Sequence, residues 1–104
     1  MHYSYCEYAL LFKALSDETR LKILNILSGN ELCACDILDE VNITQPTLSY
    51  HMKILNSCGL VNSRKDGSWI KYTLKNEKIN ELKEFLMEVD SIKEKIFKND
   101  DRCK

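Results

Sequence analysis

The chain has 104 residues, 44 % of them hydrophobic and 30 % charged, with only three glycines and one proline. This length fits one domain with a thin margin of stability, and so few breakers favour a helical fold. No run of about 18 apolar residues occurs, which excludes a predicted membrane span. The first residues lack a signal-peptide profile, so we expect a cytoplasmic protein. We expect one domain over residues 1–98 and a polar tail over 99–104.

The number of cysteines limits the kinds of chemistry expected of the chain. Five cysteines in a chain without a signal-peptide profile call for a reducing compartment, and the odd number argues against a closed disulfide framework. Free thiols are then used for packing or for chemistry with metals and oxidants. The five are Cys6, Cys33, Cys35, Cys58 and Cys103.

The net charge of −1 is unevenly distributed along the chain. Residues 1–41 carry a net −4, whereas residues 42–75 hold five basic residues against one acidic residue, a net +4. Residues 76–104 return to −1. Because a phosphate backbone responds to the local field rather than to the total charge, the middle segment is a candidate for binding nucleic acid.

Apolar periodicity, caps and turn residues predict five helices and one hairpin. The first helix covers about residues 3–15, the second begins at Ser16-Asp17-Glu18, and the third is short. Gly29 and Gly59 mark the ends of the second and fourth helices. The expected elements are helices over 3–15, 16–28, 33–40 and 44–58, strands over 60–64 and 69–74, and a last helix from about 79 to 96.

The fourth helix combines a buried stripe with a polar face. Thr44 is placed to cap it and Pro46 falls in its first turn. Leu48, Met52 and Leu55 recur at i, i+4 and i+7, which predicts the buried side. The remaining side chains are mostly hydrogen-bonding types and are expected to face a DNA groove, with Lys53 on a phosphate. They are Gln45, Thr47, Ser49, Tyr50, His51 and Lys53.

A hairpin follows the fourth helix, since Asp66-Gly67 is a strong turn signal between two strand-like segments. Arg64 and Lys65 near its tip are expected to reach a phosphate or the minor groove, and Lys71 adds a further charge. The order of a short helix, a polar-faced helix and a hairpin predicts a winged helix-turn-helix: a mainly α fold with a small β-hairpin.

The last predicted helix has a narrow apolar seam on an otherwise charged surface. Such a seam needs a partner helix, so we expect a homodimer formed through the N- and C-terminal helices. The seam consists of Ile79, Leu82, Leu86, Val89, Ile92 and Ile96, of which the first four are the principal dimer candidates.

Cys33 and Cys35 are two residues apart, a spacing that by itself is a weak motif for ion binding. On a regular helix a spacing of two places side chains about 200° apart, so one ion cannot be held by both. Either Cys33 precedes the helix or ion binding distorts its first turn. Thiolates are soft ligands and select soft ions. The alternative is that both are small buried hydrophobic residues.

Four segments resemble the ArsR/SmtB group of metal-responsive repressors: ALSDETRL at 14–21, ELCACD at 31–36, TQPTLSYHMKIL at 44–55 and GLV at 59–61. The resemblance implies a homodimer that represses a resistance operon from a palindromic operator and leaves it on binding arsenite. Arsenite sensors of this group often carry a third cysteine three residues after the second, where this chain has Leu38. For the third ligand we consider Cys6 first, across the dimer, then Cys103, then a small thiol or water.

Other functions are compatible with the same residues. The effector of the same repressor fold could be cadmium, lead or zinc, or the input could be oxidation of Cys33 and Cys35. A winged helix that binds protein rather than DNA belongs to a different class. An enzyme is not expected, because we find no phosphate-binding loop, no nucleophile–base set and no Cys-x-x-Cys beside a βαβ pattern.

Overall fold

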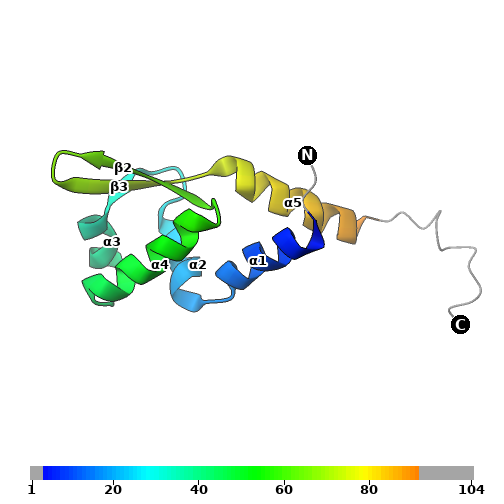
Figure 1. Cartoon of the computed structure of the whole chain (residues 1–104), viewed down its shortest axis with the longest axis horizontal. Coiled ribbons are helices and arrows are strands. Elements are labelled where there is room, and N and C mark those ends of the chain that lie inside the picture. The colour runs from blue at the N-terminus through cyan, green and yellow to red at the C-terminus, as the bar shows by residue number, and fades with distance from the viewer. Residues whose placement is uncertain (1–3, 92–104) are drawn as a thin grey trace, which may run out of the picture.

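A computed structural model of the chain describes residues 4–91. Along them run α1 (Tyr5–Leu15), α2 (Glu18–Ile26), β1 (Leu32–Cys33), α3 (Ala34–Glu40), α4 (Gln45–Ser57), β2 (Val61–Asp66), β3 (Trp69–Leu74) and α5 (Asn76–Asp90). The strands form an antiparallel sheet in the order β1-β3-β2, and the β2–β3 hairpin projects beside α3 and α4 (Figure 1). The predicted fold class, a mainly helical winged helix-turn-helix, is confirmed.

The caps of α1 and α2 show why the chain turns at residue 16. Ser4 and Glu7 form a reciprocal capping box that starts α1. The hydroxyl of Ser16 donates to the carbonyl of Lys13 at 2.7 Å and so closes α1. Within the Ser16-Asp17-Glu18 start predicted for the second helix, the N-cap of α2 is Asp17, whose carboxylate accepts from the Arg20 amide at 3.0 Å. This amide lowers the pKa of the Asp17 carboxyl.

Helix α4 begins as predicted. Thr44 is its N-cap and its hydroxyl oxygen accepts from the amide of Thr47. The stripe of Leu48, Met52 and Leu55 is buried, in agreement with the helical period. The helix ends at Ser57, and Gly59 follows with a φ of +83°, a conformation that glycine adopts without strain.

The hairpin is longer than the sequence suggested. Its strands extend to Asp66 and resume at Trp69, so that only Gly67 and Ser68 form the turn. Gly67 has a φ of +65°. The alternation of Ile70, Tyr72 and Leu74 along the second strand predicts that all three are buried, but Ile70 is 41 % exposed, because the outer part of the hairpin projects beyond the core.

Strand β1 was not predicted. It has two residues, Leu32 and Cys33, which pair with Tyr72 and Lys71 of β3. Two residues are too few for a periodic pattern, so the strand exists only through this long-range pairing. It attaches the segment before α3 directly to the β2–β3 hairpin, which is the wing of the fold.

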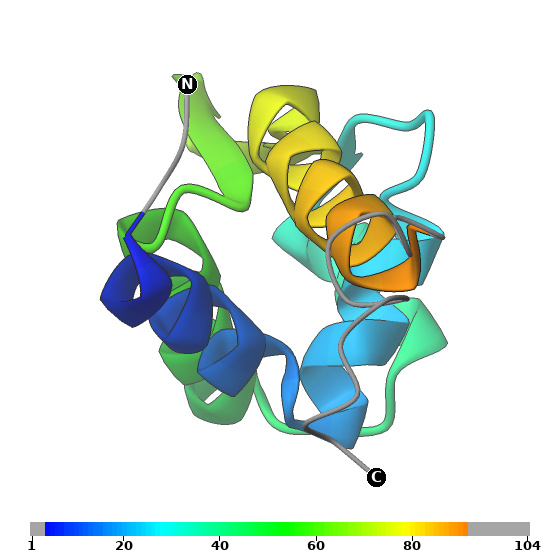
Figure 2. The same ribbon diagram turned by 90° about the vertical axis from the view of Figure 1, so that its right-hand side faces the viewer.

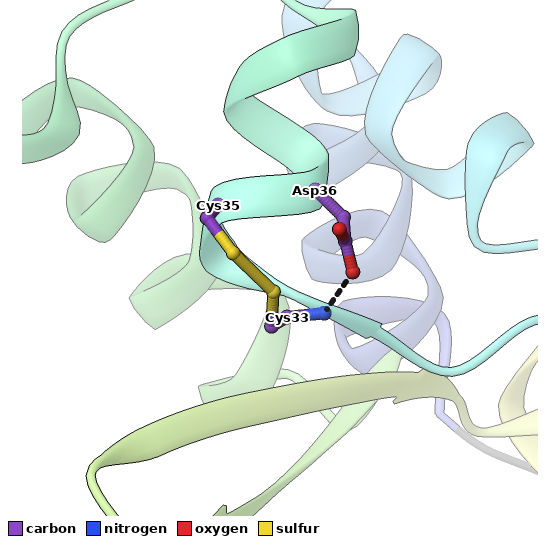
Figure 3. A group of neighbouring side chains, drawn as sticks. All are labelled: Cys33, Cys35 and Asp36. Carbon is purple, nitrogen blue, oxygen red and sulfur yellow. Dashed lines mark hydrogen bonds between the residues drawn. A yellow bond between two sulfur atoms is a disulfide. The ribbon is translucent and has the colours of Figure 1, made fainter.

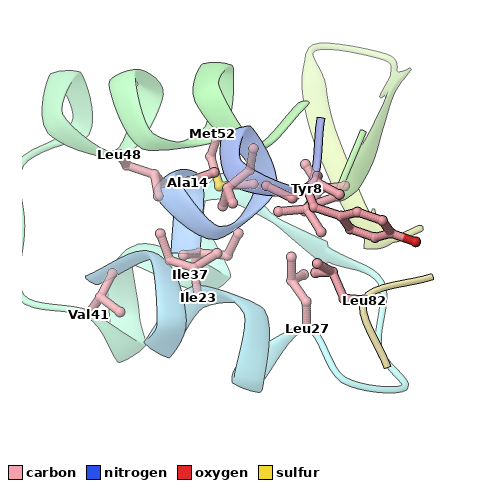
Figure 4. Close-up of a cluster of buried hydrophobic side chains, with 13 residues drawn as sticks. Tyr8, Ala14, Ile23, Leu27, Ile37, Val41, Leu48, Met52 and Leu82 are labelled. Atoms are coloured by element: carbon pink, nitrogen blue, oxygen red, sulfur yellow. The ribbon is translucent and has the colours of Figure 1, made fainter. Parts of the chain in front are cut away.

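The core lies where the helices meet and includes side chains from every helix (Figure 4). Helices α1 and α5 lie side by side at the end of the molecule away from the hairpin (Figures 1 and 2), and the rings of Tyr8 and Phe85 are 4.6 Å apart. The side chains of the expected dimer seam therefore fall into a buried group and an exposed group. Leu82 is 6 % exposed and belongs to the chain's own core, whereas Leu86 and Val89 are largely exposed.

Ile79 is only partly buried and packs against the same core. Ile92, Ile96 and the predicted tail 99–104 lie outside the described residues. Among residues 4–91, no helix has both the length and the apolar character needed to cross a membrane.

Candidate nucleic-acid interface and metal site

The polar face of α4 is open to solvent, as the sequence predicted. Gln45, Thr47, Ser49 and Lys53 are exposed, and Tyr50 is 61 % exposed. Because α4 begins at Gln45, four of these five side chains lie in its N-terminal half, the part that contacts base edges in a helix-turn-helix protein.

His51 does not belong to this face. It is 7 % exposed, and its Nδ1 lies 3.3 Å from Nη1 of Arg20. Position 51 is three residues after Leu48 and four before Leu55, so the helical period places it within the buried stripe. A guanidinium only donates, so Nδ1 of His51 is the acceptor in this contact. Arg20 also donates to the carbonyl of Ala14 at 2.7 Å, which joins α4 to the α1–α2 corner.

The wing carries its predicted cations, and the side chain of Arg64 binds an acidic partner. Its guanidinium binds Glu31 through two hydrogen bonds, Nε to Oε2 at 2.6 Å and Nη2 to Oε1 at 2.8 Å. This contact lowers the pKa of Glu31 and raises the pKa of Arg64. Lys71 binds Asp66 at 3.1 Å, whereas Lys65 is exposed.

The two candidate cysteines meet at the start of α3. Cys33 precedes the helix as its N-cap, with an extended backbone (φ −82°, ψ 165°), and Cys35 lies in the first turn. Their Cα atoms are 5.4 Å apart and their sulfurs are joined in a disulfide (Figure 3). Of the two alternatives that the sequence left open, the structure shows the first: Cys33 precedes the helix, which begins at Ala34, so the two side chains are not held about 200° apart by a regular helix.

Asp36 is a neighbour that the sequence analysis missed. Its Oδ2 accepts from the amide of Cys33 at 3.1 Å (Figure 3). The ligand atoms of Cys33, Cys35 and Asp36 all lie within 4.8 Å of one another, close enough to share one metal ion. The signal was an acid three residues after the N-cap, the spacing of a capping box. In the dithiol form this donor set suits a soft ion, since thiolate sulfur is the ligand.

A cavity of about 320 Å³ connects this site to the polar face of α4. Cys35 of α3, Gln45 and Ser49 of α4, and Trp69 of the wing all line it. A ligand or a shift at Cys35 therefore acts on the same space as two of the candidate base-reading side chains.

Of the candidate third ligands, Cys6 is among the described residues, and the structure does not bring it to this site. Cys6 is exposed in the first turn of α1, and that end of α1 lies at the opposite end of the molecule from α3 (Figure 1). Cys103 lies outside the described residues. Cys58, the C-cap of α4, is half-buried, and burial raises the pKa of its thiol, which suits a packing role.

These features define a class of protein: a winged helix-turn-helix fold with two joined cysteines at the start of α3, the helix before α4. Residues 17–63 match the family model of bacterial regulatory proteins of the arsR family. The chain belongs to this family, whose members are transcriptional regulators and not enzymes.

Two relatives with descriptions of their function are similar to this chain over more than two thirds of its length. Over 74 residues the chain is 50 % identical to an arsenical resistance operon repressor of Staphylococcus xylosus, covering 71 % of each chain. It is 39 % identical over 79 residues to a homologue of the cadmium resistance transcriptional regulatory protein CadC of Staphylococcus aureus, covering 75 % of this chain and 65 % of the other.

Among solved structures, an ArsR-like transcriptional regulator from Rhodococcus sp. RHA1 superimposes with a TM-score of 0.74 at 32 % identity, covering 84 % of this chain and 82 % of that one. Together these relatives favour DNA binding over the protein-interaction module considered from the sequence.

Proposed function

We propose that the chain is a cytoplasmic repressor of a metal(loid) resistance operon and leaves its operator when an arsenite-like ion binds Cys33 and Cys35. One observation carries the proposal: two cysteine sulfurs meet at the N-terminus of α3, and α3 packs against α4, the proposed recognition helix. The similarity to the arsenical resistance operon repressor of Staphylococcus xylosus supports the same input.

The ion chemistry is a ligand exchange without oxidation or reduction. Two thiols replace two hydroxides of As(OH)₃, two As–S bonds form, and the thiol protons leave with the hydroxides as two waters. The cysteines must be in the dithiol form, so a disulfide such as that in the structure has to be reduced first by a thiol reductant.

Operator reading is assigned to the exposed face of α4. Gln45 offers a bidentate donor–acceptor pair for adenine, and Thr47, Ser49 and Tyr50 offer hydroxyls to base edges or phosphates. Lys53 and Lys65 are assigned to the phosphate backbone. His51 is removed from the predicted set, because it is buried against Arg20.

The switch follows from where Cys33 and Cys35 are anchored. Cys33 pairs with Lys71 of β3, whereas Cys35 lies on α3 and lines the cavity shared with Gln45 and Ser49. An ion that fixes both sulfurs changes the angle at which β1 enters α3 and displaces the wing or α4. Release then requires that the ion binds more tightly to the displaced state.

A third sulfur for arsenite is assigned to Cys6 of a second copy. Cys6 is exposed and far from α3 in its own chain, so only another copy can bring it to the site. Cys103 is the second choice, and a small thiol or water is the third. Asp36 is close enough to contribute a carboxylate oxygen to ions that accept oxygen ligands.

A homodimer through α1 and α5 is part of the proposal. Exposed apolar side chains gather on these two helices, and such surface favours a partner. A two-fold dimer predicts a palindromic operator with half-sites about one helical turn apart. The exposed large apolar residues of α1 and α5 are Tyr5, Leu10, Leu86, Met87 and Val89.

The test is release of a fluorescent DNA duplex, selected in vitro for binding to the parent chain. Under reducing conditions arsenite should release the parent, whereas Cys33→Ser and Cys35→Ser should remain bound. Cys58→Ser is the matched control and should respond like the parent, because Cys58 lies outside the site. Release of Cys33→Ser and Cys35→Ser at the parent's arsenite concentration would contradict the proposal.

Two other inputs are separated by the same assay. The similarity to the cadmium regulator homologue favours cadmium as a second candidate ion, and the Cys33–Cys35 disulfide favours oxidation as a second candidate signal. Stronger release by cadmium or by peroxide than by arsenite would assign the input accordingly. In both cases the same two cysteines are required.

A further inference from the structure

Charged side chains occupy one face of the small sheet beside the cysteine site. Cys33, Lys71 and Arg64 are opposite one another across β1, β3 and β2. Directly opposed residues of antiparallel strands point to the same face, and residues two apart along a strand do so as well. Asp66 therefore shares this face with Arg64, and the hydrogen bonds from Arg64 bring Glu31 to it too.

Both charged partners of Arg64 are acids. Glu31 holds the guanidinium in a two-pronged contact at 2.6 and 2.8 Å, and Asp66 lies 3.9 Å from Nη1. The Arg64 side chain nevertheless remains 53 % exposed. A phosphate binds a guanidinium in the same two-pronged geometry, so Glu31 and a DNA phosphate need the same donors.

We infer that Glu31 is an affinity-setting residue, which withholds Arg64 of the wing from the operator backbone by occupying the donors that a phosphate would use. The inference rests on the proposed DNA binding and deepens it. Although the sequence places several cations in the wing, Arg64 is held by Glu31 and Lys71 by Asp66. Lys65 is then the wing cation that meets the backbone in the parent chain.

Removal of the charge of Glu31 tests this competition. Glu31→Gln keeps the side-chain size but holds the guanidinium more weakly, so Arg64 gains a phosphate. We expect about fivefold tighter binding to the selected duplex at low salt. The slope of log K against log salt should steepen by about 0.9, the value for one phosphate.

The second arm of the test identifies Arg64 as the group released. Arg64→Gln in the parent should change affinity by less than about twofold, since Glu31 holds the Arg64 donors there and Arg64 contributes no phosphate contact. In the Glu31→Gln background the same change should remove the whole gain. Additive effects of the two substitutions would overturn the inference.

Asp39→Asn is the matched control, because it removes one exposed negative charge from the neighbouring helix α3. It should leave the salt slope unchanged. An equal gain in affinity from Asp39→Asn and Glu31→Gln would overturn the inference, because it would reflect net charge alone. If the parent selects no duplex at all, the proposed function fails and the inference fails with it. If the parent binds and releases with arsenite but the slope of Glu31→Gln is unchanged, only the inference fails.

Discussion

The two ends of the molecule differ in what they expose. The end formed by β1, α3, α4 and the β2–β3 hairpin, here the reading end, exposes hydrogen-bonding side chains, paired charges and two joined cysteines. The α1–α5 end exposes large apolar side chains such as Leu10, Leu86 and Val89. Hydrogen-bonding and charged side chains are thus gathered at the reading end, where Trp69 and Ile70 of the wing are exposed as well, while the α1–α5 end exposes apolar surface for which we propose a second copy as the partner.

The sharpest comparison within the α1–α5 end is between two leucines of α5. Leu82 is 6 % exposed and Leu86 is 51 % exposed. Leu82→Ala should lower the free energy of unfolding by about 2–5 kcal/mol, because it leaves a cavity in the core. Denaturant unfolding at low protein concentration measures this, with Leu86→Ala as the matched control. Equal losses for both variants would show that the described burial is wrong.

Association is the second property that separates the ends. Leu86→Asp should raise the dimer dissociation constant about 30-fold, or about 2 kcal/mol, because it places a charge in the apolar contact. Sedimentation at several concentrations provides the measurement. Ser49→Asp places the same charge on the reading end and should leave association unchanged. A dimer that tolerates Leu86→Asp would remove α5 from the interface.

The contact of Arg20 with His51 links helix α2 to helix α4. Arg20→Met should cost about 1–2 kcal/mol of stability, because the buried Nδ1 of His51 loses its donor. Lys22→Met removes an exposed cation from the same helix and should cost far less. Thermal unfolding distinguishes the two, and equal melting temperatures would mean that the Arg20 contact adds nothing.

The smallest expected effect concerns the cap of α2. Asp17→Ala should cost about 1 kcal/mol at neutral pH, since the Arg20 amide loses its acceptor. The pKa of Asp17 is lowered in the folded chain, so its stabilisation is present above the unfolded pKa of about 3.9. It is lost as the pH falls through the lower folded value. The difference between parent and Asp17→Ala should therefore shrink in acid, whereas a constant difference would exclude the carboxylate as its source.

Local patterns in the sequence were sufficient for most of the helical frame. Thr44, Leu48 and Leu55 were assigned correctly, because capping and helical periodicity act within a few residues. The two-residue strand β1 could not be predicted in this way, since its hydrogen bonds come from β3, nearly forty residues later.

Side-chain roles were harder to predict than elements. His51 was expected on the DNA face because it is polar. Its position three residues after Leu48 and four before Leu55 places it in the buried stripe of α4, where it contacts Arg20. Arg64 was expected to reach a phosphate or the minor groove, and its pairing with Glu31 was not predicted because Glu31 lies 33 residues earlier. Cys33 and Cys35 were singled out through the resemblance to metal-responsive repressors, because their spacing alone is a weak motif, and the structure brings their sulfurs together at the start of α3.

The central claim is that the sulfurs of Cys33 and Cys35 hold the effector, and X-ray absorption at the arsenic edge tests it most directly. In the arsenite-loaded, reduced chain the account predicts sulfur neighbours around arsenic in the parent and in Cys58→Ser. It predicts one fewer sulfur in Cys6→Ser and the loss of both local sulfurs when Cys33 and Cys35 are replaced by serine together. An arsenic shell of oxygen alone in the parent, or an unchanged sulfur shell in the double variant, would contradict it.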